Sequence, residues 1–130
     1  MFVVNKDDLT IHCTRGDAGS FSVGANLGDN PDEVVPYTFR VGDIVRLTVC
    51  AKKDYSSIML EKDVEVTEAT ELVQFNLDSD ETKFGDVINK PTEYWYTIEL
   101  NPDTNCQTII GHTEEGARVF MLYPEADGGN

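Results

Sequence analysis

Hydrophobic and polar residues alternate along most of the chain. Val45, Leu47 and Val49, for example, alternate with Arg46 and Thr48. A period of two over such runs is typical of strands that are buried on one face. The segments that show this pattern are 9–13, 21–25, 37–39, 45–49, 58–60, 64–66, 73–77, 94–100, 109–110 and 117–123.

Turn-forming residues separate these segments. The pairs Gly16-Asp17 and Gly42-Asp43 each lie between two of them. Glycine has the backbone freedom that a tight turn needs, so we expect Gly16, Asp17, Gly42 and Asp43 to be structural turn residues. A helix is expected only as a turn or two within residues 80–89, because no longer segment has a helical apolar stripe. Short strands with turns at this spacing predict an all-β sandwich or barrel.

The expected strand faces define a core and one outward aromatic residue. The residues expected to be buried are Leu47, Phe75, Tyr96 and Ile98. A period of two also places Tyr94 and Tyr96 on one face and Trp95 on the other. Trp95 is therefore the candidate interaction surface, because an outward aromatic residue is typical of protein interfaces.

Length and cysteine content limit the organisation of the protein. A chain of 130 residues is expected to form one domain. We expect this domain over residues 1–124 and a polar, frayed tail over residues 125–130. The three cysteines, Cys13, Cys50 and Cys106, have no CxxC spacing, which favours free thiols in a reducing cytoplasm. Cys13 and Cys50 lie in strand-like runs and are expected to be small buried hydrophobes.

The net charge argues against a nucleic-acid partner. The chain has 24 acidic against 10 basic residues, a formal charge of -14. Such a surface repels phosphate, so we expect no nucleic-acid partner.

The longest apolar run, Val119 to Tyr123, is far too short to span a membrane. We also expect no secretory signal, because charged residues follow Met1-Phe2-Val3-Val4 at once.

One acidic motif has a catalytic interpretation. Leu77 to Thr82 matches the hDxDxT string of the haloacid-dehalogenase phosphatases, in which the first aspartate attacks phosphorus and magnesium lies between the two. A magnesium-dependent phosphatase using Asp78 and Asp80 is therefore an alternative function. The chain lacks the alternating strand-helix pattern of that fold, however. The sequence favours a polar turn in which Asp78 or Ser79 caps a short helix.

Other motifs favour structural roles or a binding site. Arg15-Gly16-Asp17 is the tripeptide that integrins recognise, but it also suits a tight connection between two strands. The acidic segments 29–33 and 78–81 could bind calcium, although neither has EF-hand spacing. His12 and His112 have no ligand partner at a suitable spacing. A carbohydrate- or calcium-binding β-sandwich that uses Trp95 and the acidic loops therefore stays an alternative.

Three ordered strings resemble a known family. The first is residues 11–17, IHCTRGD, followed by FSV at 21–23, and the second is residues 37–49, YTFRVGDIVRLTV. The third is residues 75–82, FNLDSDET, followed by YWYTIEL at 94–100. In this order the strings resemble the N-terminal domain of phage baseplate upper proteins and related small tail and prophage proteins of Gram-positive bacteria. The resemblance covers nearly the whole chain, from about residue 9 to residue 123.

The resemblance implies a single immunoglobulin-like, antiparallel β-sandwich of about 7–9 strands. It implies a non-enzymatic structural or interaction role, with no cofactor. The expected partners are other protein subunits of a tail or baseplate, or further copies of the chain. Such a protein is made in the bacterial cytoplasm and assembled into a phage particle. The baseplate proteins continue into long C-terminal parts that are not present here, so a stand-alone accessory protein or a host protein that shares the fold is also expected.

Overall fold

The structure is a computed structural model that describes residues 1–5, 8–25, 36–111 and 117–125. These residues form nine strands and one short 3₁₀ turn. The strands are β1 (Phe2–Val4), β2 (Ile11–Thr14), β3 (Gly19–Val23), β4 (Ile44–Cys50), β5 (Ile58–Glu65), β6 (Val73–Leu77), β7 (Thr92–Leu100), β8 (Gln107–Ile110) and β9 (Arg118–Tyr123). The 3₁₀ turn, η1, is Glu81–Lys83 and lies within the expected helical segment.

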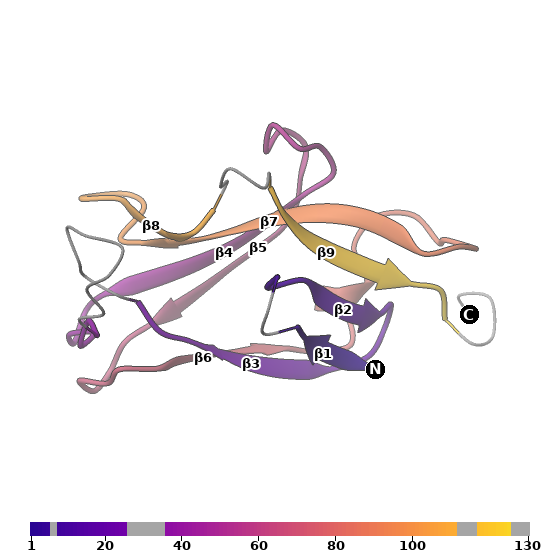
Figure 1. The fold of residues 1–130 in the computed structure, drawn as a ribbon. Helices are drawn as coiled ribbons and strands as arrows, with labels where there is room; N and C mark the ends of the chain where they lie inside the picture. Colours follow the sequence, from indigo (N-terminus) through magenta and orange to yellow (C-terminus); the bar gives the residue numbers. More distant parts are fainter. Residues whose placement is uncertain (6–7, 26–35, 112–116, 126–130) are drawn as a thin grey trace.

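Two sheets of unequal size face each other, which confirms the prediction of an all-β, sandwich-like fold (Figure 1). The large sheet has the order β1-β2-β9-β7-β4-β5, and β8 pairs with the part of β7 that β9 does not reach. The small sheet is β3-β6.

The expected antiparallel arrangement is wrong for one pair, because β2 and β9 run parallel. Parallel neighbours need a long crossover, and the chain between these two strands supplies it. Side chains alternate with the same period in parallel and antiparallel strands, so the sequence pattern could not distinguish the two.

The core lies between the inner face of the large sheet and the small sheet. Leu47, Phe75 and Ile98 have no exposed surface, and Tyr96 is 1% exposed, so the predicted strand faces are confirmed. Phe75 of β6 stacks on Phe21 of β3 with ring centroids 5.3 Å apart. Residues of both sheets therefore share one apolar cluster.

The sheets also approach each other along both edges. Phe2 of β1 stacks on Phe21 of β3 at 6.0 Å, and a Cβ atom at Gly19 would lie 2.2 Å from the Phe2 ring. At the other edge, Lys62 points to the inner side of β5, opposite Leu47, and its Nζ lies 2.9 Å from Glu81. An inward charge on an edge strand discourages the addition of a further strand.

Three details of the strand prediction differ from the structure. Strand β1 was not predicted, because three residues are too few to show alternation. Strand β5 is continuous, whereas the sequence predicted two pieces separated by the charged residues 61–63. Segment 37–39 was predicted to be a strand, and it contributes only the isolated bridge between Phe39 and Thr70.

Candidate functional site

The outer face of the large sheet has an apolar half and a polar half. Alternate residues of each strand point to this face, away from the small sheet. Strands β1, β2, β9 and the first part of β7 form the apolar half. By strand register, its outward residues are Val3, His12, Thr14, Glu93, Trp95, Val119, Met121 and Tyr123, so this half is mainly apolar and aromatic but includes the carboxylate of Glu93. Strands β5, β4, β8 and the second part of β7 form the polar half.

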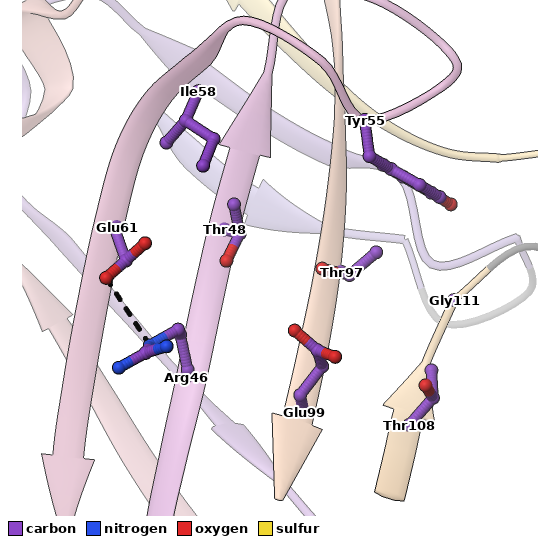
Figure 2. A pocket seen from close by; sticks show the side chains of 9 residues that line it. All are labelled: Arg46, Thr48, Tyr55, Ile58, Glu61, Thr97, Glu99, Thr108 and Gly111. Carbon is purple, nitrogen blue, oxygen red and sulfur yellow. Dashed lines mark ion pairs between the residues drawn. The ribbon is translucent and has the colours of Figure 1, made fainter. Parts of the chain in front are cut away.

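A hollow of about 620 Å³ opens in the polar half. It is lined by Arg46, Thr48, Tyr55, Ile58, Glu61, Thr97, Glu99, Thr108 and Gly111. Figure 2 shows these side chains across four neighbouring strands, with Tyr55 on the loop that joins β4 to β5. Thr48 and Thr97 lie directly opposite each other in register. The hollow thus combines hydroxyl groups, carboxylates, one guanidinium and one aromatic ring.

Arg46 is held by carboxylates at one side of the hollow. Its Nε and Nη2 donate to the two oxygens of Asp63 at 2.7 and 3.0 Å. The guanidinium also donates to Asp103, at 3.2 and 3.3 Å, and lies 3.5 Å from Glu61. Hydrogen bonds with Asp63 and Asp103 raise the pKa of Arg46, and the Arg46 guanidinium lowers the pKa of Asp63. The guanidinium is therefore engaged within the protein.

Glu99 lies in the hollow without a cation beside it among the described residues. It is directly opposite Arg46 in the register of β4 and β7, yet Arg46 turns to β5 instead (Figure 2). Its hydrogen-bond partner is the Cys106 thiol, which donates to Oε2 at 3.0 Å. This bond raises the pKa of Cys106. The carboxylate is thus available to an incoming positive charge.

Trp95 lies beside the hollow rather than in its lining. Its neighbours in register are Val119 of β9 and Cys50 of β4, and its side chain is half-buried. The Lys53 Nζ lies 5.8 Å from the centre of the indole ring, within the range of a cation–π contact. The structure therefore places Trp95 on the outer face, at the boundary between its apolar and polar halves.

The turn residues Gly16 and Asp17 are bound to Thr82. Gly16 has a φ of +87°, and its N–H donates to Thr82 Oγ1 at 3.1 Å. The same hydroxyl donates to the Asp17 carbonyl at 2.9 Å. Thr82 is completely buried, so one hydroxyl satisfies backbone groups of a distant turn. The first and third strings of the resemblance therefore meet at this contact.

Arg15 points into the protein, which argues against recognition of the Arg15-Gly16-Asp17 tripeptide by an integrin. The residue is 8% exposed, and Nη1 donates to Glu125 at 2.8 Å. Nη2 donates to the carbonyls of Lys83 and Gly85. Glu125, which was expected to begin the frayed tail, is thus fixed by an ion pair. The rest of that tail, residues 126–130, lies outside the described residues.

Gly42 and Asp43 form the turn before β4. Gly42 has a φ of +95°. One oxygen of Asp43 accepts hydrogen bonds from the Arg40 N–H and the Tyr37 hydroxyl, both at 2.9 Å, and the other accepts from Asn101 at 3.2 Å. Partial burial raises the pKa of Asp43, but these hydrogen bonds outweigh it and lower the pKa overall. The carboxylate therefore closes the turn before β4 and joins it to Asn101, just after β7.

Asp78 and Asp80 do not converge on a common site. Asp78 Oδ1 accepts the Glu81 N–H at 2.8 Å, and Glu81 Oε1 accepts the Asp78 N–H at 3.1 Å. This reciprocal pair has the hydrogen bonds of a capping box and closes the turn that leads into η1. Asp80 is exposed on the same turn and is the N-cap residue of η1, without a side-chain cap bond. Asp78 therefore bonds the first N–H of η1, but the N-cap itself is Asp80 rather than Asp78 or Ser79 as the sequence favoured.

The other candidate ligands are placed as follows. His12 Nδ1 lies 2.8 Å from the Tyr123 hydroxyl on the outer face. His112 and the acidic segment 29–33 lie outside the described residues. Within the described part of the chain, no three His, Cys, Asp or Glu side chains are grouped so that they could hold a metal ion.

The cysteines are free thiols, and two of them are buried as expected. Burial is the main cause that raises the pKa of Cys13 to about 12, and burial also raises the pKa of Cys50. Cys106 is exposed at the rim of the polar half, beside Glu99. Cys13 and Cys50 therefore act as packing residues in the folded protein.

Comparisons with models of known protein families, with curated proteins and with solved structures gave no match. Within the described residues, none of the helical structure is long and apolar enough to cross a membrane. The site is therefore defined by its geometry alone.

The sequence indicated Trp95 and did not indicate the hollow. Its lining comes from four strands and a loop, and the neighbours of Arg46 depend on the strand order β5-β4-β7-β8. The available signal was the alternation of Thr48, Thr97 and Glu99 with apolar residues, which places them on the outer face. Alternation does not reveal which strands are neighbours.

Proposed function

We propose that the protein is a non-enzymatic structural module that binds neighbouring protein subunits through the outer face of its large sheet. The observation that carries the proposal is the join of an apolar half and a hollowed polar half on that face. Val3 is 52% exposed on β1, and Ile58 is 59% exposed on β5, at the opposite edge of the sheet. Between them lie the partly exposed side chains of Trp95, Val119 and Met121. A face that presents aromatic and apolar side chains beside polar ones is typical of protein interfaces.

The assignment to a phage or prophage tail or baseplate rests on the sequence resemblance. Residues of the three strings are in contact within this fold. The turn of the first string is hydrogen-bonded to Thr82 of the third string, and Asp43 of the second string is hydrogen-bonded to Asn101, the residue that follows the third string. The resemblance and the functional assignment that it implies both stay the proposal.

The test is the molar mass of purified full chain by size exclusion with light scattering, alone and with each product of the genes that flank its own. A defined homo-oligomer, or a stable complex with one of those products, is the expected result. The variant Trp95→Ala should weaken the complex, whereas Val87→Ala, at an exposed apolar residue elsewhere, should not. A monomer at high concentration that binds none of the products would overturn the proposal.

A carbohydrate-binding module is the second candidate. The hollow presents the Tyr55 ring and three threonine hydroxyls, which resembles the mixture of aromatic and hydrogen-bonding groups in small-molecule sites. Stabilisation is the measurement, because a ligand that binds only the folded state raises the melting temperature. A rise of several degrees with one sugar of a panel would support this candidate, and the same screen with calcium tests the calcium alternative.

The phosphatase alternative predicts hydrolysis of a generic phosphate ester with magnesium, abolished by Asp78→Asn. We expect no activity, because the Asp78 carboxylate is engaged in the capping box. Activity that depends on Asp78 would replace the structural proposal with an enzymatic one.

A further inference from the structure

We propose that the hollow receives an arginine side chain from a partner protein, with Glu99 as its main counter-ion. This inference rests on the proposed function and adds the chemistry of the partner. It depends on three observations: the charge around the hollow, the position of Glu99, and the aromatic ring of Tyr55 in the lining.

The charge around the hollow favours a cation. One guanidinium, that of Arg46, stands against the carboxylates of Glu61, Asp63, Glu99 and Asp103. Asp63 and Asp103 are engaged with Arg46, so they neutralise it rather than a ligand. Glu61 also forms an ion pair with Arg46, at 3.5 Å, so the carboxylate of the lining that Arg46 does not engage is that of Glu99. A charged group from a partner would therefore be attracted if it is positive and repelled if it is negative.

The position of Glu99 suits a guanidinium. Arg46, its register neighbour, is turned away, and the described partner of Glu99 is a weak thiol donor. Thr97 and Thr108 line the same hollow, and their hydroxyls can accept hydrogen bonds. A guanidinium has five N–H donors in a plane and can bond a carboxylate and hydroxyl oxygens at once.

The Tyr55 ring adds an aromatic surface to the hollow. Tyr55 is one of the lining residues, and a guanidinium can stack on an aromatic ring. The Tyr55 hydroxyl is buried and has no hydrogen-bond partner among the described residues, so the ring rather than the hydroxyl is what a ligand can contact.

The experiment uses the ¹⁵N-labelled full chain at physiological salt. The probe is the capped peptide Gly-Ser-Arg-Ser-Gly, and its control has neutral citrulline in place of arginine. We expect saturable shifts of the backbone amides of Thr97, Glu99 and Thr108 with the arginine peptide. The affinity of the citrulline peptide should be lower by at least about tenfold, because citrulline cannot make the charge-assisted hydrogen bond that arginine makes. A lysine peptide tests whether the planar guanidinium matters.

The variants test Glu99 itself. Glu99→Gln should weaken the arginine peptide about tenfold, and Glu93→Gln should leave its affinity within about twofold. Glu93 is the matched control, because it lies on the same strand and the same face but outside the hollow. Unchanged amide dispersion outside the hollow shows that each variant is folded.

The outcomes separate this inference from the proposed function. Equal binding of the citrulline peptide, or equal weakening by both variants, would overturn the arginine site. Shifts at the same amides with maltose or N-acetylglucosamine, and none with the peptide, would also overturn it. A protein complex that Glu99→Gln does not weaken leaves the proposed function standing and removes the inference. Binding of the arginine peptide without any protein partner would leave an arginine site in the hollow but overturn the proposed function, and with it the assignment of that arginine to a partner protein.

Discussion

Single side chains hold together segments that are far apart in the sequence. Arg15 links the end of β2 to the η1 region and to Glu125, and Asp43 links the turn before β4 to Asn101. Arg15 is buried and bonds through both Nη atoms, whereas its Nε has no partner among the described residues, and Asp43 is partly buried with both carboxylate oxygens bonded. Removing only one member of such a hydrogen-bonded pair costs stability, because the other member is left buried without a hydrogen bond or a counter-charge.

Arg15→Met is expected to lower the free energy of unfolding by about 3–5 kcal/mol, because it leaves Glu125 as an unpaired, nearly buried charge. Arg15→Lys should lose less, although an ammonium cannot reproduce the fork of bonds. Urea unfolding followed by circular dichroism measures both variants. Adding Glu125→Gln to Arg15→Met should restore part of the loss. A loss that is the same with or without Glu125→Gln would show that the ion pair is not the cause.

Asp43 predicts a pH dependence of stability. Its pKa in the folded protein is lowered from 3.8, so it contributes stability that is present above that value. The contribution is lost as pH falls through the lowered pKa, because the unfolded chain then binds the proton more readily. We expect the urea midpoint of the wild type to fall more steeply below about pH 4 than that of Asp43→Asn. Asp86→Asn, at an exposed position, is the control and should keep the wild-type slope.

At the scale of strands, the sequence predicted which residues of each strand face the core. It did not predict which strands are neighbours or in which direction they run. The alternate residues of 45–49, 73–77 and 94–100 that were expected to face the core are buried, because alternation is a property of each strand alone. The parallel pairing of β2 with β9 and the hollow depend on strand order, which alternation does not contain. The edge strand β5 was divided in the prediction, because an edge tolerates charges that a central strand excludes.

Phe75→Ala tests the predicted facing of β6. Phe75 is fully buried and packs against Phe21, so the substitution should cost about 3–5 kcal/mol. Gln74→Ala, at the exposed neighbouring position, should change stability by less than about 0.5 kcal/mol. Denaturant unfolding of the two variants measures the difference. Similar values for both would mean that the strand register is wrong by one residue.

At the scale of the whole molecule, the two sheets form one structural unit. The apolar cluster contains residues of both sheets, and contacts such as Phe2 with Phe21 and Lys62 with Glu81 join their edges. Neither sheet buries an apolar face of its own without the other. The single domain expected from the sequence therefore predicts one cooperative transition.

Unfolding should be two-state by independent probes. Trp95 fluorescence reports on the outer face of the large sheet, whereas far-ultraviolet circular dichroism reports on all strands. We expect the two urea curves to coincide, with one midpoint and one slope. An earlier dichroism transition would show that the small sheet separates first, and a single-domain description would then fail.

The parallel pairing of β2 with β9 has a consequence for biosynthesis. Strand β2 leaves the ribosome early together with its first partner β1, but its second partner, β9, is among the last segments of the described chain to be made. Until then, one edge of β2 is without hydrogen-bond partners. Pairing between such distant segments is slow, and an open strand edge invites contact with other nascent chains. We therefore expect the first half of the chain to be prone to association with its copies until translation has reached β9.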